Sequence, residues 1–160
     1  IDVRGLVNTS VQYNNIREIR NVGVRVALAN GRTISVQNNT ISNQTVNYGF
    51  SQGIALVDVP NAWVTVTSNT ILQTSSVPNQ LGTGIYLACV TPATVFGTIA
   101  NHTTLARVRT GIHLINIQGK YAFTILSNSI AFTKPNNFYT TEHSGIRLEG
   151  CATIRVDNNT

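Results

Sequence analysis

Three side chains with acid–base or anion-binding chemistry hold the same position in a phrase that recurs along the chain. The phrase reads Gly-Ile-x-Leu, and its third position is Tyr86, His113 or Arg147 in three of the copies. A tyrosine or histidine can accept a proton from the carbon beside a sugar carboxylate, and an arginine can neutralise that carboxylate. These residue types fit proton abstraction from an acidic sugar. They also fit plain binding of such a sugar, or an ordinary solvated β-face.

Further residues suited to glycan binding lie on the same strand position or elsewhere on the predicted surface. Arg25 and Ala55 hold the third position in two other copies, and Arg25 adds a positive charge. Tyr48 and Tyr139 lie in long connections, where binding residues gather on rigid scaffolds. Trp63 points outward by alternation, so it could stack on a sugar ring or pack under a loop or a partner chain.

The acidic residues are too few and too scattered for hydrolysis or for a metal site. The whole set is Asp2, Glu18, Asp58, Glu142, Glu149 and Asp157. Glycoside hydrolysis needs two carboxylates flanking one bond, and a calcium site needs several clustered oxygen ligands. No cysteine–histidine metal spacing is present either, so we expect no metal and no cofactor. His102 and His143 stand alone and are expected to be polar surface groups.

A repeat of about 30 residues organises these positions. Apolar residues alternate in short runs within each repeat, as in Ile54-Ala55-Leu56 and Val64-Thr65-Val66. This period of two predicts short strands, and no stretch has the periodicity of a long helix. Three strands in each repeat, all in the same chain sense, predict a coil whose three sides stack as parallel sheets.

An asparagine recurs once in each repeat, just before the last strand. The set is Asn14, Asn39, Asn69, Asn101, Asn128 and Asn159. Asparagine tolerates the left-handed backbone conformation that a corner requires, and stacked amides can bond to one another. We therefore predict a ladder of corner asparagines. In the fourth repeat either Asn101 or His102 could hold the corner.

The recurring phrase, followed by Asn-x-Ile, resembles the repeat of the right-handed parallel β-helix of the pectate-lyase-like superfamily. The resemblance covers nearly the whole chain and implies an all-β solenoid of about five to six coils. It implies little about function, because that superfamily includes lyases, hydrolases, epimerases, phage tailspikes, adhesins and non-catalytic surface proteins. The carboxylate clusters of its pectate lyases and pectin hydrolases have no counterpart in this sequence.

The repeat also predicts which outward residues share a column on adjacent coils. The column of Trp63 is expected to contain Thr33, Trp63, Val95, Ala122 and Thr153. A second outward column on the Gly-Ile-x-Leu strands is mostly apolar and contains Ala27, Val57, Ala88, Ile115 and Glu149. An apolar outward column suggests a face covered by loops or by another subunit.

Length, charge and cysteine content set the remaining limits. The 160 residues form one predicted domain, 1–160, which we expect to be a segment of a longer solenoid. The net charge of +5 favours anionic partners such as acidic polysaccharides, whereas no basic cluster interleaves with aromatics as nucleic-acid binding would require. No apolar run is long enough to span a membrane. Cys89 and Cys151 should lie about two strand spacings apart, too far for a disulfide.

We therefore expect a non-catalytic segment of an extracellular or cell-surface solenoid. Its role would be structural or adhesive, and it could contact acidic glycans at the edge that holds the long connections. One alternative is a fragment of a polysaccharide lyase or epimerase acting on an acidic polysaccharide, with Tyr86, His113 and Arg147 as the residues to test. A second alternative is the shaft of a phage tailspike. Lateral or end-to-end protein contacts are expected in each case.

Overall fold

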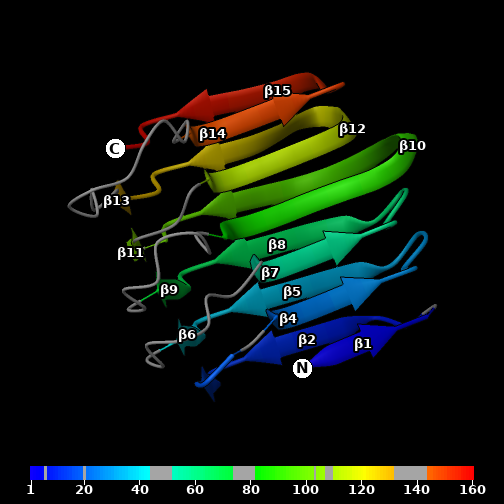
Figure 1. The fold of residues 1–160 in the computed structure, drawn as a ribbon. Helices are drawn as coiled ribbons and strands as arrows, with labels where there is room; N and C mark the ends of the chain where they lie inside the picture. Colours follow the sequence, from blue (N-terminus) through cyan, green and yellow to red (C-terminus); the bar gives the residue numbers. More distant parts are fainter. Residues whose placement is uncertain are drawn as a thin grey trace.

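The computed structural model describes residues 1–5, 7–19, 21–43, 52–73, 82–102, 104–106, 110–131 and 144–160, with the backbone alone at 43, 73, 104–106 and 120–122. Every regular element in these ranges is a β-strand, and the strands wind as stacked coils (Figure 1). The predicted all-β parallel solenoid is therefore confirmed, while its right-handed sense stays a prediction.

The strands form three parallel ladders, one on each side of the coil. The first ladder joins β1 (Asp2–Arg4), β4 (Val22–Ala27), β7 (Gln52–Val57), the first half of β10 (Thr83–Ala100), the first half of β12 (Thr110–Leu126) and β14 (Ser144–Glu149). The second joins β2 (Thr9–Gln12), β5 (Thr33–Gln37), β8 (Trp63–Thr67), the second halves of β10 and β12, and β15 (Ala152–Asp157). The third joins β3 (Asn15–Ile16), β6 (Thr40–Asn43), β9 (Thr70–Gln73), β11 (Thr104–Ala106) and β13 (Ile130–Ala131).

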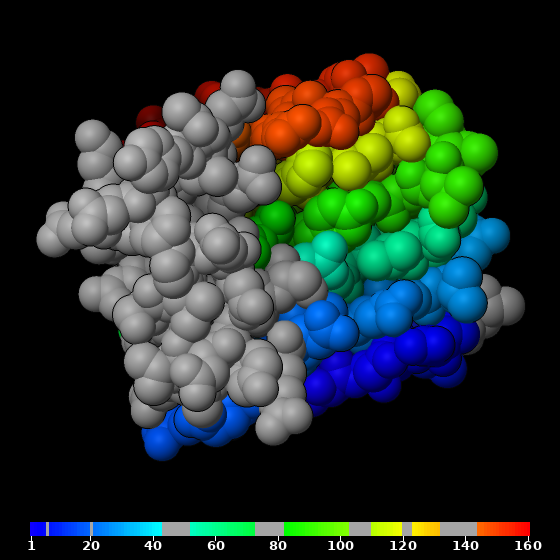
Figure 2. All heavy atoms as spheres, viewed as in Figure 1, coloured from blue at the N-terminus to red at the C-terminus, as the bar shows by residue number. Residues whose placement is uncertain are grey.

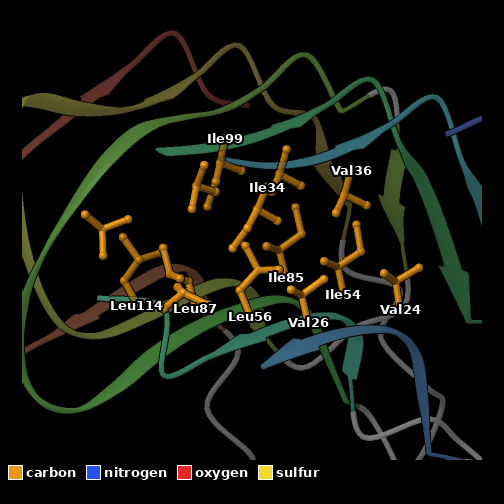
Figure 3. Close-up of a cluster of buried hydrophobic side chains, with 14 of the residues drawn as sticks. Val24, Val26, Ile34, Val36, Ile54, Leu56, Ile85, Leu87, Ile99 and Leu114 are labelled. Carbon is orange, nitrogen blue, oxygen red and sulfur yellow. The ribbon is translucent and has the colours of Figure 1, made fainter. Parts of the chain in front are cut away.

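The core lies between the first and second ladders, where inward side chains of one sheet meet those of the other (Figure 3). Ile54 and Leu56 of β7 and Val64 and Val66 of β8 are fully buried, as are their counterparts on neighbouring coils. Each such side chain contributes about 1.5–3 kcal/mol when it leaves water. The alternation seen in the sequence therefore gives a continuous apolar column along the solenoid.

The glycine of the repeated phrase makes room for the isoleucine of the third ladder. A Cβ atom on Gly53 would lie 2.6 Å from Cγ2 of Ile71 and 2.7 Å from the carbonyl oxygen of Gly84. Gly23 and Ile41 are in the same relation, at 2.7 Å. The glycine of Gly-Ile-x-Leu and the isoleucine of the following Asn-x-Ile are thus in direct contact within one coil, although they are separated in sequence.

A buried line of hydrogen bonds runs along the corner between the second and third ladders. The Oδ1 atom of Asn39 accepts the backbone N–H of Asn14 at 3.0 Å, and Oδ1 of Asn69 accepts that of Asn39 at 3.0 Å. Each side-chain amide also donates to a carbonyl of the preceding coil, as Asn69 does to Val36 at 2.9 Å. The predicted ladder is confirmed, and each asparagine clamps the corner of the coil before it.

The left-handed residue at this corner is the one before the ladder position, which corrects the expectation that the ladder asparagines adopt this conformation. Asn38, Ser68, Asn101 and Ser127 have φ angles of 53°, 55°, 57° and 54°. The chain turns at these residues, so that the next residue can point its side chain along the ladder. Asn101 therefore takes the turning position in its coil.

His102 holds the ladder position in that coil, and it is 1% exposed, so the expectation of a surface histidine was wrong. Its Nδ1 lies 3.3 Å from the backbone nitrogen of Asn69, and its Nε2 lies 3.1 Å from the carbonyl oxygen of Val66. A neutral ring with its proton on Nε2 accepts the first hydrogen bond and donates the second, as an asparagine amide does. Nδ1 also lies 3.1 Å from the Asn69 carbonyl, a contact that becomes a hydrogen bond only when Nδ1 carries a proton too.

Candidate functional site

The third residues of the repeated phrase form one outward column on the first ladder, as predicted. The register pairs Arg25 with Ala55, Ala55 with Tyr86, Tyr86 with His113, and His113 with Arg147. Neighbouring strands lie about 4.8 Å apart, so the column is a straight line of side chains along the solenoid axis. Figure 2 shows the outer face of this ladder at the front, from β1 in dark blue to β14 in orange.

Glu149 lies in the neighbouring outward column, paired with Ile115 as predicted, but its carboxylate reaches this column, a contact that the sequence reasoning did not predict. It stands two residues after Arg147 on β14, so both side chains point outward. Its carboxylate forms an ion pair with Nε of Arg147, and Oε1 lies 3.3 Å from Nε2 of His113. The signal was present as Arg147-Leu148-Glu149, because residues two apart on a strand share a face.

Tyr86 and His113 form an aromatic pair in the middle of the column. Their rings meet edge to face, with centroids 5.6 Å apart and an interplanar angle of 74°. The side chain of His113 is only 15% exposed, and its Nε2 atom is buried without a hydrogen-bond partner. The Glu149 oxygen lies close enough to accept a hydrogen bond from Nε2 whenever Nε2 carries a proton, in the neutral ring as well as in the imidazolium.

The protonation states of this pair follow from burial. Burial lowers the pKa of His113, and the Arg147 charge adds to that effect while Glu149 opposes it. Burial also raises the pKa of Tyr86, with smaller contributions in the same direction from Glu149 and Asp58. At neutral pH we therefore expect a neutral imidazole beside a protonated phenol. The Glu149 carboxylate beside Nε2 favours the tautomer with its proton on Nε2, which leaves the lone pair of the ring on Nδ1.

Trp63 lies on the second ladder, away from this column. The register pairs it with Thr33 on one side and with Phe96 on the other. The predicted neighbour Val95 is wrong, because Val95 is fully buried in the core. The chain between paired residues is two residues longer in this coil, since seven residues separate Ala88 from Phe96 and five separate Val57 from Trp63.

The other predicted residues fall outside these two faces. Tyr48, Tyr139 and His143 lie outside the described residues, as does the side chain of Ala122. Cys89 and Cys151 are free thiols.

Within the described ranges, no group of three or more histidine, cysteine, aspartate and glutamate residues could hold a metal ion. Those ranges also contain no helix long and apolar enough to cross a membrane. Comparison with protein-family models, with curated proteins and with solved structures found no match.

Proposed function

We propose that this chain is part of an extracellular or cell-surface solenoid of the pectate-lyase-like kind, with a structural or adhesive role, and that it binds acidic glycans without cleaving them. The observation that carries the proposal is the outward column of the first ladder, in which Arg25 and Arg147 flank the Tyr86–His113 pair. Cationic side chains at the two ends suit an anionic polymer, and the rings between them suit the apolar face of a sugar. The net charge of +5 adds long-range attraction for such a polymer.

The state of His113 favours binding over proton abstraction. A general base must come within hydrogen-bond reach of the proton that it removes. The Nε2 atom of His113 is buried and faces Glu149, so only Nδ1 could take that proton, and burial, which lowers the pKa of His113, makes the ring a weaker base. Arg147 is half exposed, and its Nε is engaged by Glu149, which leaves the outer edge of the guanidinium available to an anion.

Arg147→Ala should weaken binding of polygalacturonate by about ten-fold, since a charge-assisted hydrogen bond contributes about 1.5–3 kcal/mol. The measurement is isothermal titration calorimetry at two salt concentrations. Arg155→Ala is the matched control, because Arg155 forms the same type of ion pair with Asp157 on β15 of the second ladder. Equal losses in the two variants would show a non-specific charge effect and contradict the assignment of the face.

Glu149→Gln should strengthen binding of the same polymer several-fold. The change removes the carboxylate that neutralises Arg147 and would repel an anion beside it. Asp157→Asn changes the net charge by the same amount on the other face, so it should leave the affinity nearly unchanged. Weaker binding by Glu149→Gln would mean that Glu149 itself contacts the glycan.

The lyase or epimerase alternative is tested on the parent protein and on His113→Ala. Polygalacturonate and other acidic polysaccharides are incubated with the protein; the absorbance of an unsaturated product detects a lyase, and proton NMR of the sugar rings detects an epimerised product. We expect no product. Product formation that disappears in His113→Ala would overturn the non-catalytic proposal and assign proton abstraction to the Tyr86–His113–Arg147 column.

A further inference from the structure

The outer face of the second ladder differs in chemistry from the charged first face. Its outward residues on β2, β5, β8 and the second half of β10 carry hydroxyl, amide or apolar side chains. They are Ser10, Gln12, Thr33, Ser35, Gln37, Trp63, Thr65, Thr67, Phe96, Thr98 and Ala100. None of these is charged, whereas on β15 the face ends at Arg155, which pairs with Thr124 of β12, and at Asp157, its ion-pair partner. We call these residues the neutral face.

An exposed aromatic pair stands at one border of the neutral face. Trp63 is 55% exposed and stacks on Phe96 with a centroid distance of 5.6 Å and an interplanar angle of 9°. Phe96 supports one side of the indole, and Thr33, which is small and exposed, lies on the coil at the other side. The support fixes the orientation of the indole while much of its surface stays in water.

Hydroxyl groups continue from this pair across the neighbouring coils at strand spacing. Ser35, Thr65 and Thr98 form one outward column beside Trp63. The Thr98 and Thr124 hydroxyls are 3.1 Å apart and hydrogen-bonded, so the column extends onto β12. A ligand on this face would therefore meet an aromatic platform and a row of hydrogen-bonding groups that repeats about every 4.8 Å.

We propose that the neutral face binds an uncharged polysaccharide, with one sugar ring against Trp63 and neighbouring sugars over the Ser35–Thr65–Thr98 column. The lack of charge on β2, β5, β8 and the second half of β10 decides the ligand class, because an anionic polymer lying over these strands would lose hydration without meeting a counter-charge. A neutral sugar presents C–H groups to the aromatic ring and hydroxyls to the column. A second protein chain is the competing occupant, because interface centres also favour tryptophan and phenylalanine, and it is an outcome of the test below. This surface is separate from the acidic-glycan site and does not rest on it.

Trp63 is the sole tryptophan of the chain, so its fluorescence reports on this face alone. The probes are cellohexaose, chitohexaose and xylohexaose, with hexagalacturonate as the charged comparison. We expect a saturable change in Trp63 emission with at least one neutral hexasaccharide and none with hexagalacturonate. Calorimetry with the active sugar should show an affinity loss of at least about five-fold for Trp63→Ala.

Two further variants sharpen the test. Tyr13→Ala removes an aromatic ring that is 78% exposed at the corner after Gln12, at the border of the neutral face opposite to Trp63, and should leave the affinity unchanged. Thr65→Val keeps the shape of the column but removes a hydroxyl, and should weaken binding about two- to five-fold. No response to any neutral sugar, an equal response to hexagalacturonate, or a fluorescence change that follows protein concentration and dimer formation in sedimentation would each overturn the proposal. Loss of acidic-glycan binding in Arg147→Ala with neutral binding intact would keep the two sites distinct.

Discussion

Acid should destabilise this protein between about pH 6.5 and pH 4, and His102→Asn should remove most of that sensitivity. Burial lowers the pKa of His102 from 6.5 to about 4, although contacts with the carbonyls of Asn69 and Val66 act in the opposite direction. In this pH window the unfolded chain binds a proton at His102 and the folded chain does not. Stability therefore falls as the pH falls, by about 3 kcal/mol over the window, and this contribution levels off below pH 4.

The measurement is urea denaturation of both proteins at pH 7.5, 5.5 and 4.0. Asparagine fits position 102 because the side chains of Asn69 and Asn128 make the same contacts on adjacent coils. His102→Asn should thus be nearly as stable as the parent at pH 7.5. His102→Ala should lose about 3 kcal/mol there, since it leaves the Val66 carbonyl and the Asn69 N–H without partners and opens a cavity. The carboxylates titrate in both proteins, so their contribution cancels when the two pH profiles are compared. If stability fell with the same pH slope in the parent and in His102→Asn, the assignment of a neutral buried ring at His102 would be contradicted.

Gly53→Ala should destabilise the fold by about 3 kcal/mol or more, the upper end of the cost of overpacking a core. The new Cβ would lie 2.6 Å from Cγ2 of Ile71 and 2.7 Å from the carbonyl oxygen of Gly84. The contact with backbone cannot be relieved by a side-chain rotation, so the coils themselves would have to separate. The free energy of unfolding in urea, with circular dichroism as the probe, measures the effect.

Gly145→Ala is the internal control for this prediction. Gly145 holds the same position of the phrase on β14, but the nearest atom to its added Cβ is Cδ1 of Ile130 at 4.0 Å. An ordinary van der Waals contact should cost less than about 1 kcal/mol. If both substitutions cost the same, the loss of stability would come from a general preference for glycine in this strand and not from the close approach of coils.

The alternation of apolar residues predicted the strands, the ladders and the first outward column, because a period of two fixes which side chains point in and which point out. Arg25, Tyr86, His113 and Arg147 share a face for this reason alone. The alternation could not place Phe96 beside Trp63, because the two extra residues between the paired positions shift the second half of β10 by two positions relative to β8, and a period of two does not reveal such a shift. Glu149 was assigned to the correct column, but its contacts with His113 and Arg147 depend on side-chain torsions that the sequence pattern does not encode.

The corner required knowledge of hydrogen bonding as well as periodicity. The spacing of the asparagines predicted a ladder, yet it did not show that the turning residue and the ladder residue are consecutive. Once that one-residue offset is known, Asn101 is the turning residue and His102 is the ladder residue, as in the other coils. The sequence could not predict that a histidine would replace an asparagine in the ladder, because the hydrogen bonds that hold the histidine there depend on which ring nitrogen carries the proton.

The hydrogen bonds made by the ladder side chains, here called the corner clamps, also affect the order in which the coils fold and the way in which their number can change. Each ladder side chain reaches back by one coil, to the N–H and the carbonyl groups of the turn before it. A corner is therefore completed only when the following repeat is in place, so a chain emerging from the ribosome would secure its coils one at a time in the order of synthesis. Since no clamp skips a coil, coupling is confined to nearest neighbours. Duplication or loss of a whole repeat would change only the contacts between the two coils at that point. The length of the solenoid can therefore change during evolution with little loss of stability.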